Sequence, residues 1–513
     1  MLLIEGKDRI QMQFFSLEDR ISEGNPVRFV EAFVERIELD KLGFIIRTPK
    51  TEGRPAYHPK LMLKIYLYGY LNNLRSSRKL ERECGRNTEL QWLTGDLRPN
   101  YHTIADFRKD NPKALRSMFK LFVLFLRDSD LVGSTAIAID GTKVRASNSK
   151  KNNFGQKKID RHLAYIEEKT SEYLSQLDAN DVKDDQIKIN DIKEKIERLK
   201  GNKLHYDILG TSLAESGATQ ISTTDSDARA LLVQGQVVEV SYNVQAAVDD
   251  KHKLVIATHT INRNDRNALS GIVTESKENL EADSFTVLVD KGYHNGREIS
   301  RSTEAGITTI VAPAQIVNSN DKGTTPEYMV DKFDYDASTD TYTCPQGERL
   351  STKGTWHKKS RERDSYQYKK YRTAACKTCP VKHLCTGRAQ GGREIERSEF
   401  AAAVQANNQR YKENQALYRK RQEINEHIFG TIKRGWSYGH TNLRGLEKVN
   451  GEYALIMTVY NMKRSINILG MPKILEKLKK WTPDYQKVVI FVLKRLFKTS
   501  HSSSRIMISK VAA

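Results

Sequence analysis

Two apolar segments that each end in an aspartate constrain the fold of this chain more than any other feature of its sequence. The segment 136–139 is Ala-Ile-Ala-Ile and precedes Asp140, and the segment 285–289 is Phe-Thr-Val-Leu-Val and precedes Asp290. Each aspartate is followed within two residues by a glycine. This pattern predicts two buried strands with a carboxylate at the end of each. An aspartate before a glycine is ordinary turn chemistry, but its repetition in one region favours a shared acidic site.

The segments between and after these strands complete the pattern of an α/β core. "YNVQAAVDD" and "KLVIATHTI" predict a hairpin of two strands, and a helix is expected at about 265–280. A helix-forming stretch at 403–434 carries Glu426, and 157–202 has the three-and-four spacing of two helices packed as an antiparallel hairpin. These parts follow one another in ribonuclease H-like order. We therefore predict an α/β ribonuclease H-like catalytic core with an inserted helical hairpin.

Residues 1 to about 130 are expected to form a helical N-terminal domain. Apolar residues recur at helical spacing in "PVRFVEAFVERI" and "PKLMLKIYLYGYL", and the second segment runs directly into the basic "NNLRSSRKLERECGRN". One interpretation is a helical domain with a solvated face. The other is a DNA-binding module whose basic residues contact phosphates or base edges. Under the second interpretation the DNA-binding residues are Arg75, Arg78, Lys79 and Arg82.

The chain is strongly basic, since 84 Lys and Arg residues against 64 Asp and Glu residues give a formal charge of +20. This charge favours a polyanionic partner, because Lys and Arg side chains that neutralise phosphates release counterions. A ribosome-associated or membrane-surface protein would have the same sign of charge. No segment has eighteen consecutive apolar residues, and "MLLIEGKDRI" is too short and too charged for a signal peptide. We therefore expect a cytoplasmic protein that contacts no membrane.

Four of the five cysteines fall in the segment 331–400, which interrupts the core pattern. So few cysteines argue against a disulfide scaffold, and their clustering in a reducing compartment indicates metal binding. "CKTCP" has the short spacing of a zinc knuckle, and four thiolates form the usual shell of structural Zn²⁺. We predict a zinc ribbon-like insertion without chemical function; His383 could replace one ligand, and free thiols in a loop are the alternative. The zinc ligands would be Cys344, Cys376, Cys379 and Cys385.

Several short motifs occur in the order found in one family of enzymes. They are "PNYHTIADFRK", "AIDGTKVRA", "TTDSDAR", "YNVQAAVD", "VLVDKGY" and "EINEHIFGTIKR", followed by "LRGLEKVNGEYAL" and "YNMKR". With these motifs the sequence resembles the DDE transposases of bacterial insertion sequences, in the broad group related to insertion sequences four and five. Within that group it is most similar to the subgroup of insertion sequence eleven-eighty-two. The resemblance covers most of the chain.

The resemblance implies a catalytic site in which three acids hold metal ions. These acids are Asp140, Asp290 and Glu426. In related families six residues separate the third acid from a lysine, and Lys433 stands at that distance from Glu426. Glu423 is the rival third acid, but no lysine follows it at that distance. In the family pattern three residues separate an arginine from the third acid; here four residues separate Arg421 from Glu426, and we expect Arg421 to contact DNA.

The same resemblance implies metal-dependent DNA transposition. Three carboxylates suit two Mg²⁺ (or Mn²⁺) ions per active site, because these ions prefer hard oxygen ligands and two ions assist displacement at a phosphodiester. The enzyme would bind the terminal inverted repeats of an insertion sequence, cut the double-stranded DNA and join the ends to target DNA in the nucleoid. Two ends must come together, so a homodimer is expected. The alternatives are an inactive or repurposed sequence-specific DNA-binding protein, and a ribonuclease H-like nuclease without strand transfer.

These expectations divide the chain into five parts. They are a helical DNA-binding domain at 1–130, the first part of the core at 131–330, the cysteine-rich insertion at 331–400, the last part of the core at 401–470 and a basic tail at 471–513. The helical hairpin at 157–202 lies within the first part of the core. The three acids are thus distributed over two core parts that the cysteine-rich insertion separates.

Overall fold

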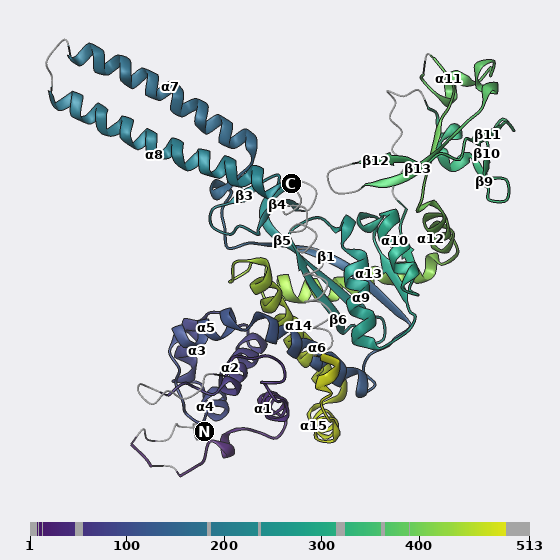
Figure 1. The fold of residues 1–513 in the computed structure, drawn as a ribbon. Coiled ribbons are helices and arrows are strands. Elements are labelled where there is room, and N and C mark those ends of the chain that lie inside the picture. The colour runs from purple at the N-terminus through teal and green to yellow at the C-terminus, as the bar shows by residue number, and fades with distance from the viewer. Residues whose placement is uncertain are drawn as a thin grey trace, which may run out of the picture.

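The structure is a computed structural model, and it combines helical and sheet regions (Figure 1). It describes residues 8, 10–12, 14–46, 55–181, 186–233, 237–313, 324–360, 365–388 and 390–488. Most of the expected basic tail, from 489 to 513, lies outside the described residues. Within the described residues, no helix has the length and the apolar character needed to cross a membrane.

Six α-helices of the described chain form the N-terminal region, at the lower left of Figure 1. They are α1 (Val27–Arg36), α2 (Pro59–Leu71), α3 (Ser77–Cys84), α4 (Thr88–Thr94), α5 (Tyr101–Asp110) and α6 (Pro112–Asp128). Local signals set two of their starts. α2 begins at Pro59, whose missing N–H and fixed φ suit the first helical position. α5 begins after Asn100, whose side chain accepts a hydrogen bond of 2.9 Å from the Thr103 N–H.

A six-stranded sheet forms the centre of the molecule (Figure 1). Its strands are β1 (Ala136–Arg145), β4 (Arg229–Val233), β5 (Val237–Asp249), β6 (Val255–Ile261), β7 (Thr286–Val289) and β8 (Thr308–Val311). β5 pairs antiparallel with β1 on one side and with β4 and β6 on the other. β1, β7 and β8 are parallel neighbours in that order. The order β6, β5, β1, β7, β8 is compatible with the expected ribonuclease H-like core.

Helices that follow the strands in sequence pack on this sheet and on the N-terminal region. They are α9 (Leu269–Leu280), α10 (Gly296–Glu304), α12 (Ala401–Glu413), α13 (Gln415–Phe429), the π-helical stretch Gly430–Gly435, α14 (Leu446–Leu469) and α15 (Met471–Lys480). α14 contacts β6, α2 and α6. Two α14 side chains, Asn450 and Asn461, accept hydrogen bonds of 2.7 and 2.8 Å from backbone N–H groups of β6. One hydrophobic core runs from Ile21 to Val488, so the N-terminal region shares its core with the sheet.

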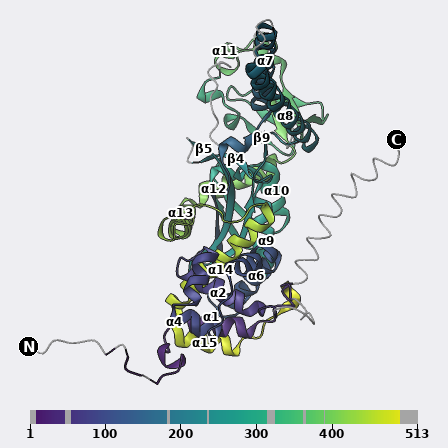
Figure 2. The ribbon, with the colours of Figure 1, turned by 90° about the vertical axis from the view of Figure 1, so that its left-hand side faces the viewer.

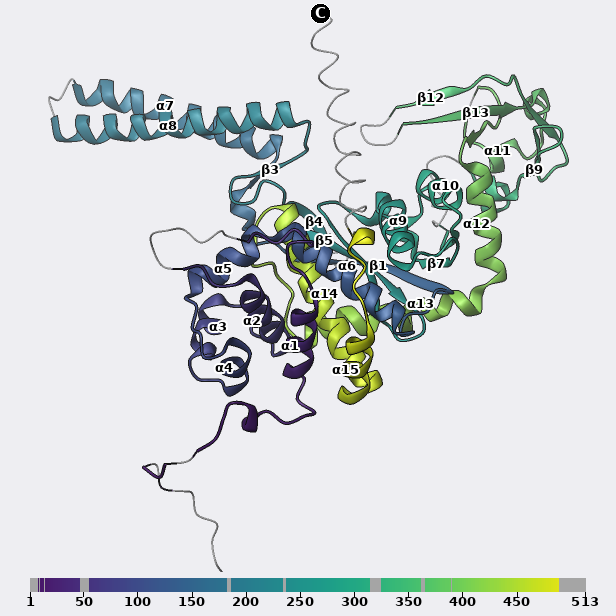
Figure 3. The same ribbon diagram turned by 60° about the horizontal axis from the view of Figure 1, so that its bottom comes forward.

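The inserted helices α7 (Gln156–Asp181) and α8 (Gln186–Ser216) lie side by side and project away from the core (Figures 1 and 3). Isoleucines at the three-and-four spacing of the sequence, among them Ile166, Ile189 and Ile192, are buried. The second helix continues beyond residue 202, where the spacing pattern ended. At the base of the hairpin the short strands β2 (Asn153–Phe154) and β3 (Ile221–Ser222) pair with each other.

The cysteine-rich segment forms a second six-stranded sheet. Its elements are β9 (Asp334–Asp336), β10 (Thr341–Thr343), β11 (Arg349–Thr352), β12 (His357–Lys359), β13 (Tyr366–Arg372), α11 (Lys382–Cys385) and β14 (Ile395–Ser398). It has a small core of its own, made of Phe333, Tyr342, Leu350, Tyr371 and Ile395. In Figure 2 this segment and the hairpin lie at the end of the molecule opposite the N-terminal helices.

Candidate active site

The structure brings the two strand-end aspartates together. β1 and β7 pair in parallel, and Ile139 of β1 lies opposite Val289 of β7. Asp140 and Asp290 are the next residues along the two strands, so they lie side by side at the same edge of the sheet. Asp140 continues within β1, whereas Asp290 caps the turn Lys291–Tyr293 that follows β7. Two adjacent carboxylates of this kind can bind a divalent cation.

The Asp140 side chain is partly buried, with 31% of its surface exposed, and is surrounded by charges of both signs. Its Oδ1 accepts a hydrogen bond of 2.8 Å from the Gly141 N–H, and its Oδ2 lies 3.8 Å from a guanidinium nitrogen of Arg421. Burial raises the pKa of the Asp140 carboxyl to about 6, and the carboxylates of Asp290 and Asp265 act in the same direction. The Gly141 N–H and the Arg421 guanidinium oppose this rise in pKa. A divalent cation would offset the repulsion between the carboxylates.

A further acid, Asp265, lies beside this pair, and the sequence did not single it out. One of its oxygens accepts hydrogen bonds of 2.7 and 2.8 Å from the side-chain amides of Asn243 and Gln245. Its other oxygen lies 2.8 Å from the Lys143 ammonium. Burial acts to raise the pKa of Asp265, but Lys143 and the two amides outweigh burial and hold the pKa below its usual value. The Tyr293 hydroxyl donates a hydrogen bond to Gln245 and so extends the network to the turn after β7.

One feature of the sequence could have revealed this network. Asn243 and Gln245 stand at alternate positions of "YNVQAAVD", and both are fully buried. Polar residues two apart on a strand face the same side of the sheet, and buried amides need hydrogen-bond partners. Asp265, in contrast, lies in the polar segment "INRNDRNAL", where sequence alone gives no reason to select it.

Glu426 lies on α13, which packs on β1, β5 and β7. Ile424 and Asn425 of this helix are buried, whereas Glu426 is exposed and its side chain forms no hydrogen bond or ion pair with the described residues. The position one turn after Arg421 belongs to Asn425, whose side chain is 2% exposed and has no hydrogen-bond partner in the described part of the chain. The structure therefore records no contact between Glu426 and the two strand-end aspartates.

Glu423 and Lys433 occupy different surroundings on either side of Glu426. The Glu423 side chain is 71% exposed and lies 3.4 Å from the Lys253 ammonium. The Lys433 ammonium donates hydrogen bonds of 3.1 Å to Thr142 Oγ1 and to the Lys143 carbonyl. Burial lowers the pKa of Lys433, and the ammonium of Lys143 acts in the same direction. Lys433 is thus attached to β1 just beyond Asp140.

A cleft of about 760 Å³ opens between the end of β1 and the segment 437–442. Its charged lining residues are Lys143, Arg145, Lys433 and Glu239. Arg145 and Glu239 form an ion pair of 2.6 Å, and the two lysines leave the cleft with a positive balance. Serine, threonine and asparagine side chains supply much of the remaining lining. A polar, positive cleft of this kind suits the phosphates of a DNA strand.

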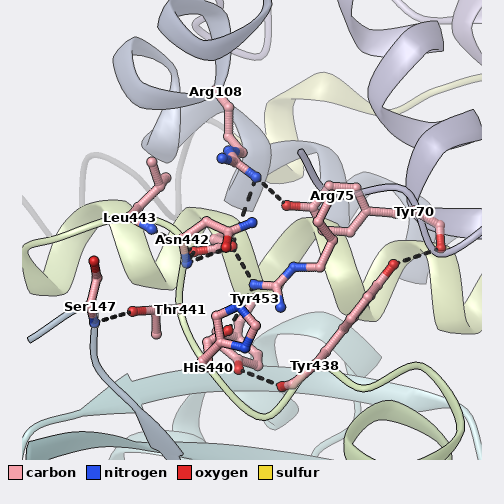
Figure 4. Close-up of polar contacts among 11 residues, drawn as sticks. Tyr70, Arg75, Arg108, Ser147, Tyr438, His440, Thr441, Asn442, Leu443 and Tyr453 are labelled. Carbon is pink, nitrogen blue, oxygen red and sulfur yellow. Dashed lines mark hydrogen bonds and ion pairs between the residues drawn. The ribbon is translucent and has the colours of Figure 1, made fainter. Parts of the chain in front are cut away.

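The structure corrects the prediction that Arg75 contacts DNA. Arg75 is 8% exposed, and its guanidinium donates hydrogen bonds of 2.6 Å to Glu452 and 2.9 Å to the His440 carbonyl (Figure 4). Arg108 approaches the same Glu452 carboxylate at 3.8 Å. Because these charges are in the interior, Arg75 joins the N-terminal region to α14 and does not face solvent.

The other three basic residues of this stretch lie on the surface of α3. They are Arg78, Lys79 and Arg82. Leu80, Glu83 and Cys84 bury the opposite side of this short helix, which leaves the basic residues exposed. The Arg78 guanidinium lies 4.5 Å from the centre of the Tyr101 ring. This surface is available to a phosphate backbone.

The four clustered cysteines line one small cavity in the cysteine-rich segment. Burial raises the pKa of the Cys385 thiol, and the other three thiols act in the same direction. Tight turns follow two of the cysteines: the Gly347 N–H donates to the Cys344 carbonyl at 2.8 Å, and the Lys382 N–H donates to the Cys379 carbonyl at 3.2 Å. Within the described residues, however, no three His, Cys, Asp or Glu side chains are close enough to hold a metal ion, here or at the acidic edge.

Comparison with known protein families gives two matches. Residues 15–110 match a family described as a transposase domain (DUF772), and residues 343–466 match a family described as a transposase DDE domain. The first match contains the exposed basic residues of α3, and the second contains Glu426 and Lys433. Searches of curated proteins and of solved structures gave no match.

Proposed function

These two matches identify the chain as a DDE transposase of the bacterial insertion-sequence type, and on that premise we propose that it cleaves DNA at the ends of an insertion sequence and joins them to target DNA. The observation that supports this proposal is that Asp140 and Asp290 directly follow the paired residues Ile139 and Val289, side by side at one edge of the sheet. DDE transposases generally act on DNA with divalent metal ions. Here the proposed ligands of two Mg²⁺ or Mn²⁺ ions are Asp140, Asp290 and Glu426.

The donor set at the acidic edge fits such ions. Both aspartates offer hard carboxylate oxygens, and both are partly exposed. When bound, two such ions activate the attacking oxygen and stabilise the leaving oxygen of a phosphodiester. Arg421 lies beside Asp140, and in this proposal its guanidinium donates hydrogen bonds to the phosphate that the metal ions bind. Lys433, in the π-helical stretch that follows α13, contributes a second positive charge beside β1.

Glu426 completes the site in this proposal, although it stands apart from the aspartates in this structure. α13 would have to turn by about 100°, the angle between successive helical residues, to exchange Asn425 for Glu426 on the face toward the sheet. The π-helical stretch directly after α13 holds an extra residue per turn, which allows such a local shift. Among the residues that the structure describes, the side chain of Asn425 has no hydrogen-bond partner to lose. We expect this exchange when DNA and metal ions are bound.

End recognition is assigned in this proposal to the N-terminal region, with Arg78, Lys79 and Arg82 as phosphate contacts. Two ends must be held at once, so the active complex is proposed to be a homodimer on double-stranded DNA. Changing these three residues together to Ala should lower the slope of log binding constant against log salt concentration by about three units. Arg75→Ala is the matched control, because it removes a positive charge from the interior. An equal change of slope in Arg75→Ala would contradict the assignment.

The cysteine-rich segment is proposed to bind one structural Zn²⁺ through Cys344, Cys376, Cys379 and Cys385. Their placement around one cavity supports this, and binding would draw the sulfurs together as thiolates. Elemental analysis should find about one zinc per chain, and none when Cys376 and Cys379 are both changed to Ser. Purified protein without zinc, in which all four thiols titrate freely, would contradict the proposal.

The transposase activity is tested by incubating the full chain with Mg²⁺ and DNA that carries the ends of its element. Inverted repeats in the DNA flanking the gene supply these ends. Cleavage followed by joining supports the proposal. Binding without cleavage indicates a DNA-binding protein, and cleavage without joining indicates a nuclease.

A further inference from the structure

The carboxylate of Asp265 lies close to the strand end that carries Asp140, where it leaves no room for a side chain at residue 141. A methyl group on the α-carbon of residue 141, directly after Asp140, would lie 2.5 Å from Asp265 Oδ1. A methyl group on the α-carbon of residue 292 would lie 2.9 Å from Asp290 Oδ1 and 3.8 Å from Asp265 Oδ2. Gly141 therefore allows the carboxylate of Asp265 to approach the strand end that carries Asp140, and the same carboxylate lies within contact distance of the turn that carries Asp290.

The same carboxylate connects three segments of the backbone. Through Asn243 and Gln245 it is hydrogen-bonded to β5, and through Lys143 it is paired with β1. Gln245 also receives the Tyr293 hydroxyl from the turn after Asp290. β5 is the direct neighbour of β1, with Gln245 opposite Gly141 and Asn243 opposite Lys143. The network therefore couples the position of the Asp290 turn to the end of β1.

We propose that Asp265 is a positioning residue of the acidic site: it holds the segments that carry Asp140 and Asp290 in place and adds a third negative charge beside them. This inference rests on the proposed function, in which these two aspartates bind divalent cations. A carboxylate near a cation site attracts the ion even without touching it, because the Coulomb energy falls only with the inverse of distance. The three partners of Asp265 keep it ionised and fixed in this role.

The test measures binding of Mn²⁺ to the full chain by calorimetry, in the absence of DNA. Asp265→Asn keeps the shape of the side chain and removes its charge, so Mn²⁺ affinity should fall about tenfold. Asp225→Asn is the matched control: Asp225 is also a buried acid with a hydrogen-bonded partner, the Tyr242 hydroxyl, but it is not among the charges that act most strongly on Asp140. Wild-type affinity in Asp265→Asn, or an equal loss in Asp225→Asn, would overturn the proposal.

A second variant separates charge from folding. Asp265→Asn combined with Gln245→Glu exchanges the acid and the amide of one hydrogen bond, and the new glutamate can still accept from Tyr293. This double variant should recover most of the lost Mn²⁺ affinity; a folded double variant that recovers none would overturn the proposal. Asp140→Ala identifies which claim has failed. If it binds Mn²⁺ like the wild type, the acidic edge is not the cation site and the proposed function itself is wrong.

Discussion

The two parts of the proposed catalytic site are held in place by different kinds of structure. Asp140 lies within β1, which is paired with β7 on one side and with β5 on the other, and Asp290 directly follows β7. Glu426 depends on the direction in which α13 faces, and this helix presents Asn425 to the sheet instead. The strand-borne acids are therefore in place in this structure, whereas the helix-borne acid is not in contact with them.

The difference follows from the geometry of strands and helices. A strand that slips by one residue loses its register of hydrogen bonds and turns its buried side chains to the other face. A helix that rotates by one residue keeps its internal hydrogen bonds and changes only its side-chain packing. We infer that the sheet side of the site is preformed and that the helix side is completed when substrate binds.

Removing either strand-borne carboxylate should give the largest effect. Asp140→Ala and Asp290→Ala are each expected to lower the rate of end cleavage about 1,000-fold or more, or about 4 kcal/mol in the barrier, because each removes a proposed metal ligand. End binding, measured by gel shift, should not change. Cleavage at the wild-type rate in either variant would remove that residue from the site. It would also contradict the inference that the strand-borne acids form the preformed part of the site.

The helix side is tested by Glu426→Gln, with Glu423→Gln as its control. Glu426→Gln should lower cleavage about 100-fold, or about 2.7 kcal/mol in the barrier, if the rotated helix brings this acid to the metal ions. Glu423, three residues earlier, is paired with Lys253 at the surface and should be replaceable without loss of cleavage. If Glu423→Gln were inactive and Glu426→Gln active, the third acid would be misassigned.

A smaller effect, on stability, is expected from Gly141→Ala. The added methyl group would lie 2.5 Å from Asp265 Oδ1 and 2.8 Å from Asn243 Oδ1, so the network must move to admit it. The free energy of unfolding in urea should fall by about 1–3 kcal/mol. Gly271→Ala, on α9 with no heavy atom within 4 Å of the new methyl group, should instead raise it by up to about 1 kcal/mol. Equal stability of the two variants would mean that the network around Gly141 adjusts to the methyl group, and that the strand-borne part of the site is less rigid than we infer.

Local patterns were sufficient to predict the elements that carry the strand-borne acids. An apolar run that ends in Asp predicted β1 and β7, and two runs joined by a polar turn predicted the hairpin of β5 and β6. Each of these signals lies within a few residues, and parallel pairing then brings the two strand ends together. The stretch 403–434 was expected to be helix-forming, but the helix breaks at Asn414 and becomes π-helical at Gly430.

The remaining features depend on partners that are distant in the sequence or on a single helical position. Arg75 belongs to a basic segment whose composition is typical of an exposed surface. However, α3 begins only at Ser77, and the Arg75 side chain points into the interior, where it donates a hydrogen bond to Glu452. The choice between Asn425 and Glu426 for the buried face of α13 is a matter of one residue, and both belong to an otherwise polar segment. Composition and spacing do not distinguish such cases, because tertiary packing decides them.

The ion pair between Arg75 and Glu452 joins residues that are 377 positions apart in the chain. During translation the N-terminal helices leave the ribosome long before α14 does. Arg75 and Arg108 therefore have no Glu452 carboxylate to pair with until synthesis is nearly complete. A guanidinium buried without that partner costs about 3–5 kcal/mol. A chain that stops before α14 therefore cannot complete the packing of its N-terminal helices. We expect gene copies with a premature stop codon to yield no stable fragment that competes with the intact protein for the ends of the element.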